Sequence, residues 1–192
     1  MNNNNYWASI GLWLPAAVLA VLYPCFLGYL AYSLRQLPHK AATHFNFRGH
    51  ANGYMNRVLY VVIILLLGLG LPLSVVVTAL LAKSGGSGLH IAPREYWLAP
   101  GRIEQTYLYL VGHSLWFACL AVSFIAGLHF LIVRANQTAP PRLSMWMLLV
   151  WLGCFFGGVL AWERTQARHF SHPWESGPEQ KGQLLGVGGV RP

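Results

Sequence analysis

Four long stretches without a charged residue constrain this chain more than any other feature. They lie at residues 10–34, 58–82, 107–133 and 143–162, and none contains Lys, Arg, Asp or Glu. A helix needs about 20 apolar residues to cross roughly 30 Å of hydrocarbon, and each stretch is long enough. A soluble domain can bury one such helix but not four in succession. The pattern predicts an all-α integral membrane protein with four transmembrane helices.

The composition agrees with this class. Hydrophobic residues make up 55% of the chain and charged residues 9%, whereas soluble domains have about 25% charged residues. The net charge is +8, but the basic residues are spread through the gaps between the apolar stretches. That spacing is typical of anchors at a lipid headgroup region and argues against nucleic-acid binding. The predicted partner of the whole chain is therefore the lipid bilayer.

We predict one transmembrane domain over residues 1–164, followed by a flexible tail over residues 165–192. The tail mixes His, Pro, Gly and charged residues without any helical period. The first apolar stretch is too long for a signal-peptide core and has no Lys or Arg before it, so we expect it to remain as a helix.

Six Lys or Arg lie in loops one and three, and seven lie in the other segments. This near balance does not set the orientation.

The most unusual segment is the first loop, Gln36 to Arg57. Polar and aromatic residues alternate from Thr43 to Phe47, which suggests a short extended piece at the membrane interface. Glycines and an Asn-Gly pair supply positions for positive φ, so we expect the chain to turn back as a hairpin. The residues that we expect to shape a binding surface are His44, Asn46, Gly49 and Gly53.

Histidines raise two other possibilities for chemistry. His39, His44 and His50 are spaced unlike a common zinc site and have no Cys or carboxylate beside them, so no metal and no cofactor is predicted. His113 and His129 are intramembrane polar residues on different faces of one helix. We expect neutral histidines bonded to neighbouring helices. The alternative is a small transporter or redox membrane protein that uses His113 and the proline-interrupted helices.

Acidic residues are absent from all four stretches, and the chain shows no nucleophile motif, paired carboxylates or phosphate loop. We therefore predict that the protein is not an enzyme.

Gly153 and Gly157 form a GxxxG pair in the fourth stretch. Such pairs let helices approach closely, either within the bundle, in a homo-oligomer, or against a protein partner for which this chain is an accessory subunit.

The first loop carries a recognisable pattern, Leu-Pro followed by His-Phe-Asn, a glycine and an Asn-Gly-Tyr segment. It resembles a bacterial membrane domain of unknown function that is found in sporulation-delay immunity proteins. Ala42, Asn52 and Tyr54 differ from the usual residues of that pattern. A second block after the second stretch is similar to one in longer members of the family; its residues are Tyr96, Trp97, Leu98, Ala99, Pro100 and Arg102. Of these, we expect Tyr96, Trp97, Pro100 and Arg102 to shape a second binding surface.

The resemblance implies a multi-pass protein of the bacterial inner (plasma) membrane and brings no activity with it. Together with the residue patterns, it leads us to expect a non-enzymatic protein that binds a partner or ligand through its two motif loops. One loop follows the first span and the other follows the second, so simple topology places them on opposite faces of the membrane.

Overall fold

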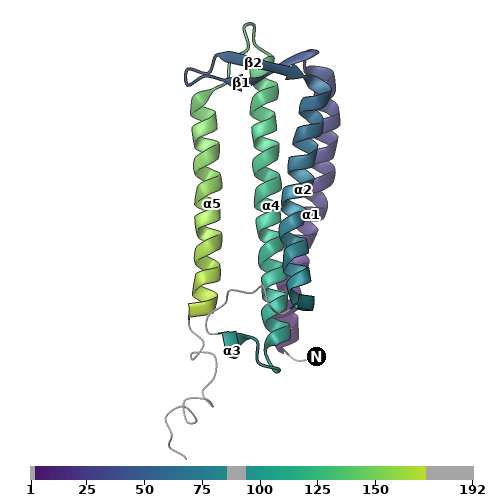
Figure 1. Ribbon diagram of the computed structural model, residues 1–192, viewed down its shortest axis with the longest axis vertical. Helices are drawn as coiled ribbons and strands as arrows, with labels where there is room; N and C mark the ends of the chain where they lie inside the picture. The colour runs from purple at the N-terminus through teal and green to yellow at the C-terminus, as the bar shows by residue number, and fades with distance from the viewer. Residues whose placement is uncertain (1–2, 86–93, 172–192) are drawn as a thin grey trace, which may run out of the picture.

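Four long helices run side by side in an elongated bundle in the computed structural model, which describes residues 3–85 and 94–171 (Figure 1). The helices are α1 (Asn3–Gln36), α2 (Arg57–Gly85), α4 (Ile103–Asn136) and α5 (Met145–Ser171). Each is long and apolar enough to cross a membrane. The expected all-α membrane architecture is therefore confirmed. The prolines of α1 and α2 lie inside continuous helices and do not break them.

Helix α4 is the centre of the bundle. Fourteen of its residues are buried, whereas α5 has no buried residue. Figure 1 shows α1 and α2 close together on one side of α4 and α5 standing on the other. Large apolar side chains on the outer faces of the helices are exposed, as lipid-facing residues are. The packed core is thus a three-helix unit of α1, α2 and α4 to which α5 is attached.

A buried hydrogen-bond chain joins the three core helices. The hydroxyl of Ser33 in α1 donates to the Leu30 carbonyl oxygen (2.7 Å), so it accepts from His129 Nε2 of α4 (2.8 Å). His129 Nδ1 then accepts from the Tyr60 hydroxyl of α2 (2.9 Å). His129 is fully buried, and both ring nitrogens are paired, which fits a neutral imidazole. The expected role of His129 as a histidine bonded to neighbouring helices is confirmed.

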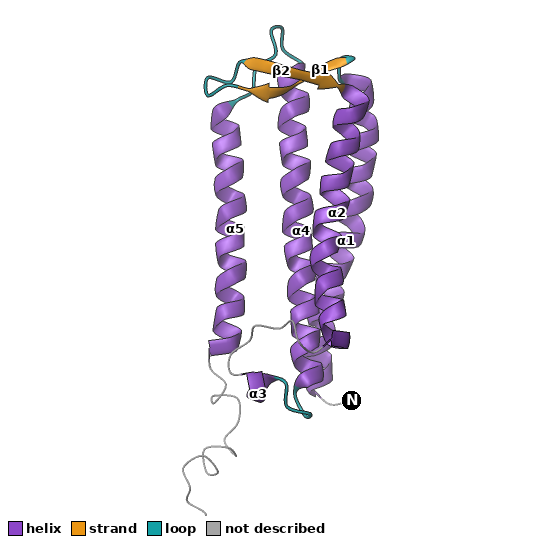
Figure 2. Ribbon diagram, in the orientation of Figure 1, coloured by secondary structure: helices purple, strands orange, loops and turns teal. Residues whose placement is uncertain are grey.

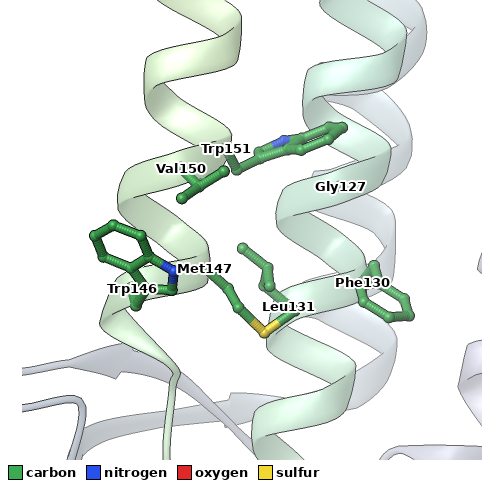
Figure 3. A pocket seen from close by; sticks show the side chains of 7 residues that line it. All are labelled: Gly127, Phe130, Leu131, Trp146, Met147, Val150 and Trp151. Carbon is green, nitrogen blue, oxygen red and sulfur yellow. The ribbon is translucent and has the colours of Figure 1, made fainter.

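Two tryptophans attach α5 to α4. Trp151 Nε1 donates to the Phe124 carbonyl oxygen (3.1 Å), and Trp162 Nε1 donates to that of His113 (2.9 Å). The indole of Trp151 lies over Gly127, where a Cβ would collide with it. Beside this contact is an apolar pocket of about 470 Å³ between the two helices (Figure 3); its lining is Gly127, Phe130, Leu131, Trp146, Met147, Val150 and Trp151.

The two ends of the bundle differ. One end is covered by a hairpin of β1 (Lys40–Phe45) and β2 (Ala51–Asn56), and the short helix α3 (Arg94–Trp97) lies at the other end (Figure 2). Helix α5 continues to Ser171, so the prediction of a flexible tail is wrong for residues 165–171. The reason is local packing, because His169 and Phe170 contact Trp97 of α3. Residues 172–192 of the predicted tail lie outside the described part.

Candidate recognition site

The candidate site is the cap, which we define as the hairpin segment 37–57 together with the α4–α5 turn, residues 137–144. Its strands pair antiparallel, with Ala42 opposite Tyr54 and His44 opposite Gly53. Leu37 and Pro38 end α1, and Asn56 begins α2 by accepting the Val58 backbone N–H on its side-chain oxygen (2.8 Å). The hairpin predicted from the sequence is present.

Asn46 and Gly49 build the turn of the hairpin. The Asn46 side-chain oxygen accepts the backbone N–H groups of Arg48 and His50, each at 3.0 Å. Gly49 has a φ of +79°, the left-handed region that glycine adopts without strain. Both motif residues therefore shape the loop from within, and neither needs a ligand to explain it.

Gly53 has a role that the sequence interpretation missed. Among the described residues only Gly49 has a positive φ, so the expectation of a positive φ at Asn52-Gly53 is wrong. Gly53 lies inside β2, opposite a register irregularity between Ala42 and His44. A Cβ there would lie 2.9 Å from His44 Cβ. The glycine makes room for the histidine ring, which remains exposed at the surface.

Asn136, the last residue of α4, fastens the hairpin to the bundle. Its side-chain oxygen accepts the Ala42 N–H (2.7 Å), and its side-chain nitrogen donates to the Ala42 carbonyl oxygen (2.9 Å). The same nitrogen donates to the Ile132 carbonyl oxygen (2.9 Å), which holds the amide in place. One side chain thus satisfies both backbone groups of a fully buried strand residue.

The α4–α5 turn makes the second attachment of the hairpin to the bundle. The Leu143 N–H donates to the Gly49 carbonyl oxygen (2.8 Å), and the Ala51 N–H donates to that of Pro141 (3.4 Å). His50 and Arg142 face each other as an antiparallel bridge. A Cβ on Gly49 would collide with the Leu143 carbonyl oxygen. Two loops far apart in the sequence therefore form one connected structure.

The outer surface of the cap is aromatic and basic. Phe47 is 98% exposed and Tyr54 is 56% exposed. The cap contains no Asp or Glu, and it contains four basic residues, namely Lys40, Arg48, Arg57 and Arg142. Arg35 of α1 and Arg134 of α4 lie next to it. The three acidic residues in the described part belong to the other end of the bundle. Basic side chains on a fastened loop favour an acidic or anionic partner.

The second motif loop lies at the opposite end, as expected from topology (Figure 2). The Arg102 guanidinium lies 4.0 Å from the centre of the Tyr96 ring, and Trp97 contacts the end of α5. The Trp97 carbonyl oxygen accepts the hydroxyl of Thr106 (2.9 Å), and Pro100 is exposed. The structure therefore does not bring these residues together with His44, Asn46, Gly49 and Gly53.

The intramembrane histidines lie in different surroundings. His129 belongs to the core, whereas His113 is stacked against Trp162 of α5 with ring centres 4.5 Å apart. The expectation that they occupy different faces of α4 is confirmed. Among residues 3–85 and 94–171, no three His, Cys, Asp or Glu side chains gather closely enough to hold a metal ion.

Gly153 and Gly157 have open space where a Cβ would lie, so they do not pack within the bundle. The predicted role in intramolecular packing is therefore wrong, and the other two roles stay predictions. The glycines that do contact a neighbouring helix in this region are Gly127 and Gly158.

Comparison with known proteins gives one match. Residues 19–69 match the model of a membrane-associated family described as a domain of unknown function, DUF1648. No curated protein and no solved structure matches the chain significantly. The matched segment runs from the middle of α1 through the hairpin into α2, and it excludes the second motif loop and α5. The chain is thus a multi-pass membrane protein whose first hairpin and flanking helices are similar to a family without an assigned function.

Proposed function

We propose that this chain is a non-enzymatic protein of the bacterial inner membrane that binds an acidic partner protein through its cap. The observation that carries the proposal is the combination of a tightly fastened cap with an exposed aromatic and basic surface. Phe47 and Tyr54 supply contact area, and Arg48 and Arg142 supply charge. A surface that is already ordered loses little entropy on binding.

In this proposal the residues of the first motif have two kinds of role. Asn46, Gly49 and Gly53 hold the shape of the surface, and His44 and His50 lie on it, both exposed. The resemblance to sporulation-delay immunity proteins supports protection against a bacterial toxin as the physiological setting. Tyr96, Trp97, Pro100 and Arg102 support the other end of the bundle and are not part of the proposed partner site.

A photo-crosslinking residue placed at Phe47 or Tyr54 in the full chain tests the proposal in intact bacterial membranes. We expect a discrete protein adduct from both positions, and an acidic segment of the captured protein should contain the crosslink. The same probe at Leu66, a 65% exposed position on the lipid-facing side of α2, is the matched control. It should yield lipid adducts alone.

Charge reversal provides the decisive comparison. Arg48→Glu together with Arg142→Glu should remove the adduct, because like charges then face the acidic partner. Glu163→Gln changes a charge at the other end of the bundle and should leave the adduct intact. An adduct that persists after both reversals, or adducts with lipid alone at Phe47 and Tyr54, contradicts the proposal.

A further inference from the structure

A second hollow, separate from the cap, lies between α2, α4 and α5 in the half of the bundle away from the hairpin. This groove has a volume of about 600 Å³, within the range of about 300–1,000 Å³ usual for small-molecule sites. Unlike the pocket in Figure 3, it carries several polar side chains on walls that are otherwise apolar. Its polar side chains come from three helices and are Ser74, Thr78, His113, Ser114, Trp162 and Gln166.

The three hydroxyl groups of the groove all have the same hydrogen-bonding state. Ser74 donates to the Leu71 carbonyl oxygen (2.7 Å), Thr78 donates to that of Ser74 (2.7 Å), and Ser114 donates to that of Leu110 (2.8 Å). Each hydroxyl proton is used within its own helix. The oxygen atoms keep lone pairs, so the groove offers acceptors to whatever enters it.

His113 adds a polar atom without a partner. The residue is 8% exposed, and within the described part of the chain its Nε2 atom is buried and makes no hydrogen bond. The ring is held between Tyr109 and Trp162, with centres 5.5 and 4.5 Å away and nearly parallel planes. An unpaired polar group inside a membrane helix is costly, and such residues usually face the interior of the bundle or a cavity.

No Lys, Arg, Asp or Glu lines the groove. Its remaining walls are apolar and include Val75, Ala79 and Leu110. A charged headgroup would enter without a counter-charge, at a large desolvation cost. A neutral head with hydroxyl groups can donate to the three acceptor oxygens.

We propose that the groove binds a neutral amphiphile with a hydroxyl-bearing head, of the monoacylglycerol class, drawn from the lipid phase. The head lies among Ser74, Thr78 and His113, and the acyl chain follows the apolar wall toward the bilayer. This site is independent of the cap, so either proposal can fail without the other.

The test uses the full chain in nanodiscs of phosphatidylethanolamine and phosphatidylglycerol, with a diazirine-bearing monoacylglycerol as the probe. We expect saturable labelling that maps to the segments of α2 and α4 lining the groove. The double substitution Ser74→Ala and Thr78→Val removes two acceptors, and it shortens only the serine side chain, by one atom. It should lower the apparent affinity about tenfold, as expected for the loss of two hydrogen bonds.

Thr165→Val is the matched control. Its hydroxyl also donates within its own helix, to the Ala161 carbonyl oxygen (2.7 Å), but it does not line the groove. This variant should label like the parent. The probe should also raise the thermal unfolding temperature of the parent and of Thr165→Val but not that of the double variant, which separates loss of binding from loss of folding.

Three results would overturn the proposal. The first is labelling of the double variant with the affinity of the parent, and the second is labelling that maps outside the groove. The third is a loss of labelling, when the phosphatidylglycerol fraction of the nanodisc is raised, as large as the loss that unlabelled monoacylglycerol causes, since that would mean the acyl chain and not the neutral head is recognised.

Discussion

Asn136 does with one side chain what a neighbouring strand would do with its backbone. Its amide pairs with the N–H and the carbonyl oxygen of Ala42 and so closes the free edge of β1 at that residue. A two-stranded hairpin is marginally stable alone. At this end of the bundle, the amide supplies the pairing that a third strand would otherwise provide.

Asn136→Ala should therefore destabilise the protein by about 2–4 kcal/mol, because it leaves two buried backbone groups of Ala42 without partners. The measurement is reversible unfolding in mixed micelles. Gln137→Ala is the matched control; that side chain bonds Gln36 at the surface, and its loss should change the unfolding free energy by less than about 0.5 kcal/mol. Equal effects of the two substitutions would show that the amide pairing contributes no stability.

Helix α5 is the element whose packing depends most on single residues. Gly127 lets the Trp151 indole lie against α4, and the indole is held there by its bond to the Phe124 carbonyl oxygen. Gly153 and Gly157 face away from the bundle. We propose the outer face at Gly153 and Gly157 as the seam for a second copy of the chain or for a helix of a larger membrane complex.

Alanine substitutions at Gly127 and at Gly153 should have opposite effects on the free energy of unfolding. Gly127→Ala overpacks a fixed ring and should cost about 1–3 kcal/mol. Gly153→Ala meets no atom and should stabilise the helix by up to about 1 kcal/mol. Unfolding in micelles measures both, and native mass spectrometry of the same samples measures the oligomeric state. If Gly153→Ala leaves that state unchanged, and so does Gly153→Leu, the proposed seam is wrong.

At the scale of the whole molecule, the two motif loops are separated by the length of the bundle (Figure 1). Phe47→Cys and Pro100→Cys, each in a chain whose three native cysteines are replaced by alanine, should react with a membrane-impermeant maleimide from opposite sides of the membrane. Both positions are exposed. The readout is labelling of intact cells compared with inverted vesicles. Labelling of both positions from one side would contradict the four-span topology.

The sequence predicts the parts of this architecture that depend on local pattern. Four uncharged stretches predict four helices, and Gly49 predicts a turn, because hydropathy and backbone preference are properties of neighbouring residues. The alternation from Thr43 to Phe47 predicts an extended segment and so misses the role of Asn46 in that turn. The tie between Ala42 and Asn136 joins residues 94 positions apart, and nothing near either one signals it. Likewise, Gly127 and Gly153 look alike in sequence, and only the rotation of α5 decides which meets a neighbour.

The polar groove also could not be predicted from the sequence. His113 was a visible candidate, but Ser74, Thr78 and Gln166 join it only once three helices are placed. Each is unremarkable alone, because serine and threonine commonly donate to their own helix.

The two ties of the cap have a consequence for how the protein is made. Ala42 binds Asn136, and Gly49 binds Leu143, so the hairpin leaves the ribosome long before its anchors exist. Until the third span is inserted and the turn after it is complete, the hairpin lacks both attachments. The contacts that attach the hairpin to α4 and to the α4–α5 turn can therefore form only after the third span and the turn that follows it are in place.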